Sequence, residues 1–249
     1  MQYSKIKYPD GQISVKITDW TFPYIVTERI NSYEDLFLVR SIAEALDSQN
    51  IKNRHLFIPC LFGQRSDRRF ADNQSFDLKI IADFINSCGF ADVSIVDPHS
   101  DVAVGLIHNA KKVSPFEWIE RSVAKRNLVL VSPDAGAYKK VHDYASKLNL
   151  PVVAAVKFRD KNGALDIKFI GDLKDQDCMI VDDLADGGGT FVALAEQLIK
   201  CGAKSVELFV THGFFTKGFD ELKKHIDRIY CTNSVKDIDN DYVKQFRIL

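Results

Sequence analysis

The sequence predicts an α/β fold with mainly parallel sheets, arranged as two consecutive domains. Short apolar runs of strand length alternate along the chain with amphipathic stretches of helix length, which is typical of parallel α/β sheets. The alternation occurs in two series, one on each side of about residue 126, and 249 residues with 46% hydrophobic content suffice for two cores. We therefore expect domains over residues 1–126 and 127–249, with no Pro/Gly/Ser-rich linker between them.

The first series begins with a helix after Ser32, a residue type that caps helix N-termini, and the acidic pair Glu34–Asp35 suits its first turn. Apolar residues recur there at helical spacing, at Leu36, Val39, Ala43 and Leu46. A strand, a second helix and a second strand are expected over residues 55–59, 76–89 and 93–97. The apolar face expected for the second helix contains Phe76, Ile80 and Phe84.

The second series starts with a buried strand, 128–134, which leads into a helix that ends near Leu148. A later helix, closed by Gly202, carries its apolar residues on one face, at Phe191, Leu194, Ala195 and Leu198. Further strands are expected at PVVAAV, CMIVDD, SVELFVTHG and IYCTNS. Strands and helices therefore alternate in this half as well.

The composition gives no electrostatic reason to expect nucleic acid or a membrane as partner. Lysine and arginine number 33 against 34 acidic residues, so the net charge is −1. No apolar stretch approaches the roughly 18 residues of a membrane span, and the polar start of the chain does not resemble a secretory signal. The five cysteines lack CxxC spacing, so we expect buried free thiols and a cytoplasmic protein.

Polar residues gather where four of the predicted strands end. The segments are RSDRR (65–69), DPHSD (97–101), SPDAG (132–136) and DDLADGGGT (182–190). Ligands of parallel α/β sheets bind beyond the carboxyl ends of the strands. Four such ends along one chain therefore favour a single ligand-binding cleft.

The last of these segments joins two carboxylates to a loop that suits an anion. The glycines at 187–189 expose backbone amides where a helix begins, and Thr190 adds a hydroxyl. Asp182 and Asp183 would repel a phosphate but suit sugar hydroxyls or a magnesium ion. Together they outline a site for a ribose phosphate, bound by its diol at one end and its phosphate at the other. The alternative is an ordinary strand–turn–helix in which Asp186 caps the helix.

Seven segments, in order, resemble the ribose-phosphate pyrophosphokinases, or PRPP synthetases. They are YPDGQ (8–12), RINSYEDLFLV (29–39), RSDRR, DPHSD, SPDAG, VKFRD (156–160) and the long VDDLADGGGTFVALAEQLIKCGAKSVELFVTHG (181–213). The resemblance runs from about Tyr8 to Ser234. It implies two tandem phosphoribosyltransferase-like domains, the first on the ATP side and the second on the ribose phosphate side, in a short variant of the family.

The resemblance also implies an activity, namely Mg²⁺-dependent transfer of the pyrophosphoryl group of ATP to the anomeric 1-hydroxyl of a ribose 5-phosphate moiety, with release of AMP. The implied ATP-binding residues are Tyr8, Asp10, Gln12, Arg65, Ser66, Asp67, Arg69 and His99. Those expected to bind ribose phosphate are Asp182, Asp183, Asp186, Gly187, Gly188, Gly189 and Thr190. The expected metal ligands are His99 and Asp134, and the expected catalytic residues are Lys157, Arg159 and His99.

These residue types suit the chemistry on physical grounds. Arg65 and Arg69 offer bidentate contacts to phosphate. Lys157 and Arg159 lie two apart on an extended segment and so face the same side, where they would stabilise charge on the bridging oxygen as AMP leaves. No Walker A motif occurs, so ATP would be held differently than in P-loop kinases.

Structural alternatives remain open for several of these residues. The alternative for Lys157 and Arg159 is a role as solvated charges at a sheet edge, and the alternative for His99 is a structural histidine. Arg68 and Arg69 would then be ordinary surface charges. Two other functions also remain open: a non-catalytic regulatory relative of the PRPP synthetases, and a phosphoribosyltransferase that consumes PRPP.

The acceptor has two candidates. The D-T-A-G-T loop of the family reads Asp186-Gly187-Gly188-Gly189-Thr190 here, so one hydroxyl near the 5′-phosphate is missing and space is expected beyond the phosphate. Ribose 5-phosphate, or a 5′-substituted form such as ADP-ribose, is therefore the expected acceptor. Because the family counterpart of YPDGQ acts across a subunit interface, the resemblance also implies a homodimer or a higher homo-oligomer.

Overall fold

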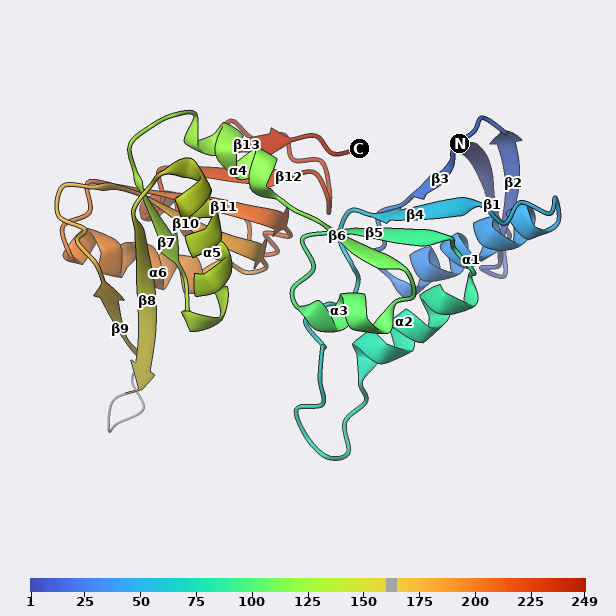
Figure 1. The fold of residues 1–249 in the computed structure, drawn as a ribbon, viewed down its shortest axis with the longest axis horizontal. Helices are drawn as coiled ribbons and strands as arrows, with labels where there is room; N and C mark the ends of the chain where they lie inside the picture. Colours follow the sequence, from blue (N-terminus) through green and yellow to red (C-terminus); the bar gives the residue numbers. More distant parts are fainter. Residues whose placement is uncertain (160–164) are drawn as a thin grey trace. The chain divides into compact units, whose positions relative to one another are not determined.

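The computed structural model describes residues 1–159 and 165–249, with the side chains of residues 157–166 outside the described part. The chain divides into two compact units, Met1–Ser114 and Pro115–Ile248, and Leu249 counts with the first. In Figure 1 the first unit runs from blue to green and the second from green to red.

The division precedes helix α4 (Phe116–Val123), whereas the sequence led us to expect a boundary near residue 126. The reason lies in the contacts of α4 and the residues after it. The Arg121 guanidinium lies 5.0 Å from the centroid of the Phe246 ring. Arg126 forms an ion pair with Glu207 at 2.8 Å. These contacts join the segment to the second unit.

The first unit contains a parallel sheet of four strands in the order β3-β4-β5-β6, with a separate antiparallel hairpin of β1 and β2. The strands are β1 (Gln2–Lys7), β2 (Ile13–Asp19), β3 (Tyr24–Thr27), β4 (Arg54–Ile58), β5 (Asp92–Val96) and β6 (Ala110–Val113). The helices are α1 (Tyr33–Asp47), α2 (Asp77–Ser87) and α3 (Asp101–Leu106).

Helix α1 begins as the sequence predicts. The Ser32 hydroxyl oxygen accepts a hydrogen bond from the Asp35 backbone N–H at 3.2 Å, and the same hydroxyl donates to the Asp35 carboxylate at 2.8 Å. The predicted apolar face is confirmed, because all its members are buried, namely Leu36, Val39, Ala43 and Leu46.

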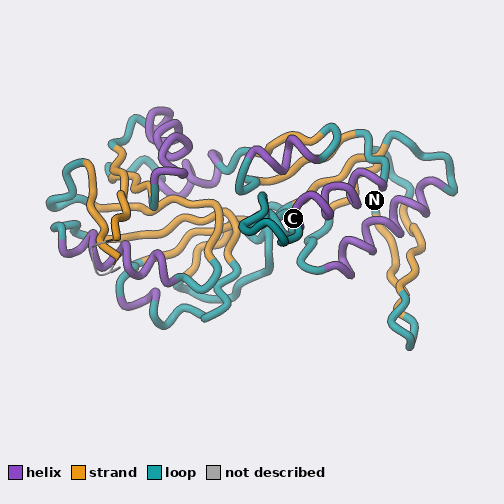
Figure 2. The backbone as a smooth tube through the Cα atoms, turned by 90° about the horizontal axis from the view of Figure 1, so that it is seen from below, coloured by secondary structure: helices purple, strands orange, loops and turns teal. Residues whose placement is uncertain are grey.

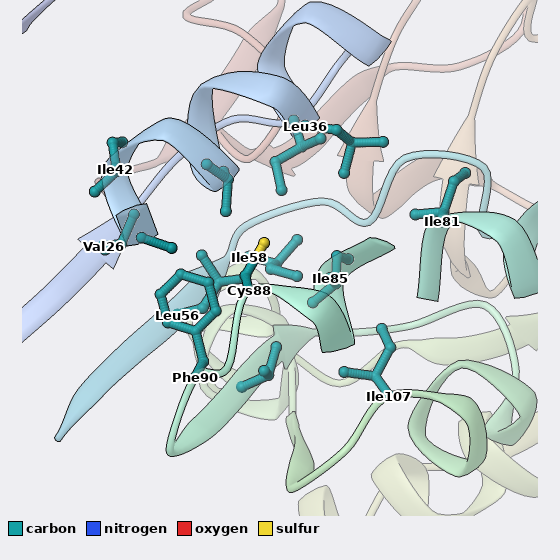
Figure 3. Packing of buried hydrophobic residues seen from close by; sticks show 14 of the residues in the cluster. Val26, Leu36, Ile42, Leu56, Ile58, Ile81, Ile85, Cys88, Phe90 and Ile107 are labelled. Carbon is teal, nitrogen blue, oxygen red and sulfur yellow. The ribbon is translucent and has the colours of Figure 1, made fainter. Parts of the chain in front are cut away.

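The apolar face predicted for α2 was wrong at Ile80, whereas Phe76 and Phe84 are partly buried and pack against the core. Ile80 is 57% exposed, and the buried face of the helix consists of Leu78, Ile81, Ala82 and Ile85. Figure 3 shows Ile81 and Ile85 packed in a cluster that also contains Leu36 of α1 and Leu56 of β4. Two apolar stripes overlap in this short helix, and the sheet buries the one that the spacing pattern did not favour.

The second unit is built on a sheet of seven strands in the order β13-β12-β11-β10-β7-β8-β9. Only the β8–β9 pairing is antiparallel among these described strands, which confirms a mainly parallel α/β architecture. The strands are β7 (Val129–Ser132), β8 (Val152–Arg159), β9 (Leu165–Ile170), β10 (Asp177–Ala185), β11 (Ser205–Gly213), β12 (Arg228–Thr232) and β13 (Val243–Phe246). The remaining helices are α5 (Ala135–Leu148), α6 (Gly189–Lys200) and the short 3₁₀ helix η1 (Leu222–Lys224).

Helices cover both faces of the central strands of this sheet. The predicted face of α6 is confirmed as buried, at Phe191, Leu194, Ala195 and Leu198. This face of α6 packs in one cluster with Val131 and Ile180. The alternate strand residues Leu130, Met179 and Val181 are also buried but lie outside that cluster, because successive side chains of a strand point to opposite faces of the sheet. Helix α5 packs on β7 and β8. Figure 2 shows the strands in orange with helices in purple beside them.

No helix in the described residues is long and apolar enough to cross a membrane. Cys60, Cys88, Cys178 and Cys231 are buried free thiols, as predicted, whereas Cys201 is exposed. Cys201 follows α6 at its C-terminal end, on the solvent side of the helix that the core does not cover.

A buried arginine joins three elements of the first unit. The Arg54 side chain is 2% exposed. Its guanidinium donates to the Asp47 carboxylate at 2.8 Å, to the Ile51 carbonyl at 2.8 Å and to the Cys88 carbonyl at 2.6 Å. These bonds connect the end of α1 and the start of β4 to the end of α2. Breaking them would leave the Ile51 and Cys88 carbonyl oxygens without this donor and the Asp47 carboxylate with the exposed Lys52 alone.

Arg54→Met is therefore expected to lower the free energy of unfolding by about 2–4 kcal/mol. Lys52→Met is the matched control, because Lys52 pairs with the same Asp47 carboxylate from a side chain that is 72% exposed. We expect it to cost less than about 1 kcal/mol. Urea denaturation of the two variants measures both values, and equal losses would contradict the structural role given to Arg54.

Candidate active site

The carboxyl end of β10 extends past its neighbour β7. β10 pairs with β11 as far as Ala185, but its pairing with β7 ends at Ile180. The acidic pair that follows Val181 therefore lies beyond the last residue of β10 that pairs with β7. It is at the carboxyl end of the strand, where parallel α/β sheets bind ligands. The turn that follows β7 carries Asp134.

The two carboxyl groups at this strand end are close together and poorly solvated. Asp183 is 8% exposed, and its backbone N–H donates to the Asp182 carboxylate at 2.9 Å. Burial, followed by the negative charges of Asp183 and Asp134, raises the pKa of Asp182 from 3.8 to about 8. In the free protein near neutral pH, Asp182 therefore holds a proton. Hydroxyl donors or a cation would favour the fully ionised pair.

Asp134 has a structural task that the sequence analysis did not assign. One carboxylate oxygen caps α5 by accepting from the Ala137 N–H at 3.0 Å. The Ser132 hydroxyl donates to the Asp134 backbone carbonyl at 2.7 Å and holds the turn. Because Asp134 contributes to the raised pKa of Asp182, its charge acts on the acidic pair. Its second carboxylate oxygen makes it suitable as a magnesium ligand.

Helix α6 begins without a side-chain cap. Its N-cap residue is Gly188, at φ 80°, which makes no side-chain hydrogen bond to the first turn. The alternative in which Asp186 caps this helix is wrong, because the Asp186 carboxylate accepts instead from the Thr216 hydroxyl at 2.7 Å. The amides of the first turn are therefore left for a ligand, and the helix dipole favours an anion there.

Two of the loop glycines lie against other side chains. A Cβ atom at Gly188 would come within 3.0 Å of Leu222, and φ there is positive, so only glycine fits well. A Cβ atom at Gly187 would lie 3.3 Å from Cδ of Lys217. The Lys217 side chain therefore lies beside Gly187, where a larger residue at this position would project.

Strand β8 carries the two predicted catalytic cations past the end of β7. The two strands pair as far as Ser132 and Ala154, and β8 then continues to Arg159 alongside the antiparallel β9. The backbones of Lys157 and Arg159 lie three and five residues beyond this pairing. They are therefore at the carboxyl ends of the parallel strands, as the acidic pair is. Their side chains lie outside the described residues.

Two predicted ATP-binding segments come together in the first unit. RSDRR and DPHSD follow β4 and β5, which are parallel neighbours. The side-chain oxygen of Gln64, a buried residue that the sequence analysis missed, accepts from the His99 N–H at 3.0 Å. The turn after β5 also places Asp97 at φ 41°, in the left-handed region. Gln64 therefore fixes the backbone next to the His99 side chain.

The arginine-rich segment already makes some contacts of its own. Arg68 donates to the Asp67 carboxylate at 2.9 Å. Burial is the largest influence on Asp67 and opposes its ionisation, but the hydrogen bond and charge of Arg68, with smaller contributions from Ser100 and His99, together outweigh burial and lower the pKa of Asp67. Arg69 donates through Nε to the Gln74 carbonyl at 3.1 Å. Arg68 is thus an exposed side chain paired with Asp67, while exposed Arg65 and partly buried Ser66 beside it remain candidates for ATP binding.

The YPDGQ segment forms the tip of the β1–β2 hairpin. The Tyr8 N–H donates to the Gln12 carbonyl at 2.8 Å, and the Gln12 N–H donates to the Asp10 carboxylate at 3.0 Å. Gly11 takes φ 90°, which the turn requires. Tyr8, Asp10 and Gln12 are all exposed at this tip.

Comparison with known proteins agrees with this architecture. The model of the phosphoribosyl transferase domain family matches residues 114–246. A ribose-phosphate pyrophosphokinase from Mycoplasma genitalium is 32% identical over 240 residues, covering 91% of this chain and 72% of the relative. Ribose-phosphate pyrophosphokinase 2 of Saccharomyces cerevisiae is 31% identical, covering 83% of this chain and 68% of the relative. The crystal structure of phosphoribosylpyrophosphate synthetase from Mycobacterium smegmatis has the same fold, with a TM-score of 0.85 at 21% identity over 99% of this chain and 86% of that one.

The second unit is thus a phosphoribosyltransferase-type domain, and its acidic strand end and glycine loop lie at the carboxyl end of β10. The similarity extends through the first unit as well. The chain belongs to the ribose-phosphate pyrophosphokinase family and is an enzyme of the diphosphotransferase type.

The raised pKa of Asp182 predicts a pH-dependent stability in metal-free protein. Between 3.8, its ordinary value, and about 8, the folded protein binds this proton more tightly than the unfolded chain, so the free energy of unfolding falls as pH rises. Asp182→Asn removes the effect. Its stability relative to the parent protein should therefore grow between pH 5 and pH 8, by at most about 1.4 kcal/mol per pH unit.

Asp177→Asn, at the other end of β10, is the control for this measurement. The hydrogen bond from Ser205 lowers the pKa of Asp177, so its contribution is present above the ordinary value and is lost only at lower pH. The stability difference for this variant should stay constant over pH 5–8. Denaturation with urea in the presence of EDTA gives both profiles, and a flat profile for Asp182→Asn would contradict the raised pKa.

Proposed function

We propose that this enzyme transfers the pyrophosphoryl group of ATP to the anomeric 1-hydroxyl of ribose 5-phosphate and releases AMP. The observation that carries the proposal is the end of β10, where an acidic pair and an uncapped glycine helix start lie on one strand–loop–helix segment. A diol donates hydrogen bonds and a phosphate accepts them. The two ends of ribose 5-phosphate therefore match the two ends of this segment.

In this proposal Asp182 and Asp183 accept hydrogen bonds from the ribose hydroxyls, and the amides of residues 187–190 bind the 5′-phosphate. The O1 atom of the acceptor forms a bond to the β-phosphorus of ATP while the bond from that phosphorus to the α–β bridging oxygen breaks. AMP leaves with the bridging oxygen, and the hydroxyl proton passes to solvent. Binding at both ends of the sugar would fix the direction in which O1 points.

The cations of the chain would stabilise the charge that develops during transfer. Lys157 and Arg159 are proposed to act on the bridging oxygen, because β8 carries their backbones to the ligand-binding edge of the sheet. Arg65, Arg69 and His99 are proposed to bind the ATP phosphates, with Ser66 and Asp67 beside them and with Tyr8, Asp10 and Gln12 of the hairpin tip.

Magnesium is part of the proposal, and the oxygen donors of the second unit fit it. The described residues contain no group of three or more His, Cys, Asp or Glu side chains that could hold a metal. Mg²⁺ is usually held by one or two carboxylates together with substrate phosphates and water, however, and Asp134 with the acidic pair offers such donors. His99 is proposed to help hold the metal-bound ATP. When bound, Mg²⁺ would neutralise phosphate charge during transfer.

A 5′-substituted ribose phosphate such as ADP-ribose is the second candidate acceptor. The feature that favours it is Gly187, which offers a backbone amide and no hydroxyl, a weaker match to a terminal phosphate with three free oxygens. The Lys217 side chain lies beside Gly187, so the case for ADP-ribose rests mainly on the missing hydroxyl. The names of the relatives favour ribose 5-phosphate.

We also propose a homo-oligomer, at least a dimer, working in the cytoplasm. The support for assembly is the exposed hairpin tip, whose polar side chains would need a neighbouring surface to take part in an ATP site. The support for the location is the set of free cysteines, which suits a reducing compartment.

Product analysis tests the proposed activity. With ATP, Mg²⁺ and equal concentrations of ribose 5-phosphate and ADP-ribose, we expect AMP together with a 1-pyrophosphorylated acceptor. The ratio of the two products gives the ratio of the kcat/KM values for the two acceptors. Release of ADP in place of AMP would mean ordinary phosphoryl transfer and would contradict the proposal.

Variants in the same assay test the residues. Lys157→Ala and Arg159→Ala should each reduce turnover by about 10³-fold, as loss of a transition-state cation does. The control is Lys168→Ala on the neighbouring strand β9, which should leave turnover within about twofold of the parent. If turnover falls by less than about tenfold in both β8 variants, Lys157 and Arg159 are solvated charges at the sheet edge and not catalytic residues.

A further inference from the structure

The side chain of Lys217 lies across the phosphate loop. A Cβ atom built on Gly187 would be 3.3 Å from Lys217 Cδ, 3.4 Å from Cε and 3.6 Å from Cγ. Three consecutive carbons at nearly the same distance mean that the stem runs along the loop surface instead of pointing at it. The methylene stem thus takes the place that a side chain at position 187 would occupy.

The backbone beside Lys217 is tied to the loop by several hydrogen bonds. The N–H groups of Phe214 and Phe215 donate to the Ala185 carbonyl at 2.8 and 3.3 Å. The Thr216 N–H donates to the Asp186 carbonyl at 3.1 Å, and its hydroxyl donates to the Asp186 carboxylate at 2.7 Å. The residue that precedes Lys217 is therefore bonded to the residue that precedes Gly187, so the two positions are held in register.

The Lys217 ammonium has no anionic partner among the described residues, whereas two other lysines of the same unit do. Lys204 pairs with Asp177 at 3.3 Å, and Lys224 pairs with Glu221 at 2.7 Å. Lys217 is exposed, and its charged end is one bond beyond the Cε atom that lies near Gly187. An available cation therefore lies beside a helix start whose amides are also available.

We propose that Lys217 is a phosphate-binding and specificity-determining residue of the acceptor site, contacting the 5′-phosphate of the ribose that the loop binds. The inference rests on the proposed function, since it assumes that the loop holds a ribose phosphate. Gly187 makes this contact of Lys217 with the phosphate possible, because a larger residue at position 187 would displace the lysine stem. The ammonium adds a full charge and up to three donors to a loop that otherwise offers amides and the Thr190 hydroxyl.

A terminal monophosphate and the first phosphate of a 5′-diphosphate share the chemistry that Lys217 would recognise. Both present anionic oxygens at the same distance from the ribose, and a lysine binds them as a point charge without demanding a planar partner. The experiment therefore includes both kinds of ligand.

Lys217→Met is the test variant, because methionine keeps an unbranched apolar stem and removes the charge. Isothermal titration without ATP, using ribose 5-phosphate and ADP-ribose in turn, should show binding about 10-fold weaker than in the parent protein. The ligand whose affinity falls more is the one that Lys217 favours. Lys217→Arg should retain most of the affinity, since it keeps the charge.

Lys200→Met is the matched control, an exposed lysine in the last turn of the same α6 helix, at the end opposite the loop. It should change neither affinity by more than about twofold. A second control places threonine at position 187. In the Gly187→Thr background the lysine stem is displaced, so the additional loss caused by Lys217→Met should shrink well below 10-fold.

The outcomes separate this inference from the proposed function. Unchanged affinity in Lys217→Met overturns the role of Lys217, even if the parent protein forms AMP. Weakened affinity supports that role, even if no AMP is formed and the proposed transfer reaction is wrong. Failure of the parent protein to bind either ribose phosphate overturns the role of Lys217 as well.

Discussion

Two carboxyl groups next to each other in a partly buried place repel one another, and the end of β10 holds Asp182 and Asp183 in that arrangement. The free protein relieves the repulsion by keeping a proton on Asp182, whose pKa burial raises to about 8. A ligand that donates hydrogen bonds, or brings a cation, replaces that proton. The chemistry of this strand end therefore suits hydroxyl donors or a cation better than a bare phosphate.

A few residues further along the chain, the local electrostatics favour an anion instead. Helix α6 starts at a glycine, and the carboxylate that would otherwise cap it, Asp186, is held by Thr216. Free amides and a helix dipole attract an anion, and the Lys217 ammonium lies at the same loop. A short segment of chain thus presents acceptors and donors in sequence. A molecule with hydroxyls at one end and phosphate at the other satisfies both.

Much of this arrangement could be predicted from the sequence, because strands, helix caps and glycine turns are local. Ser32 predicted the start of α1 correctly, and the DDLADGGGT segment predicted a strand, a loop and a helix. Features that depend on distant residues could not be predicted. Spacing alone did not identify which stripe of α2 faces the sheet, and β9 adds an antiparallel edge that no local signal distinguishes.

The lysine on the loop is the clearest example of such a distant dependence. Lys217 is 30 residues from Gly187, and nothing in its own neighbourhood in sequence indicates a phosphate site. The same holds for Gln64, which reaches the backbone of His99 from another loop. A residue that contacts a functional loop from another element becomes visible only when the chain is folded.

The central claim is that the acidic pair binds the sugar and not the nucleotide. The most direct measurement compares the affinities of Asp183→Asn and the parent protein for ribose 5-phosphate and, separately, for ATP, each with Mg²⁺. We predict that affinity for the sugar phosphate falls by about 10-fold or more, as loss of a charged hydrogen-bond partner does, while affinity for ATP stays within about twofold. Loss of ATP affinity with sugar binding intact would contradict this orientation of the site.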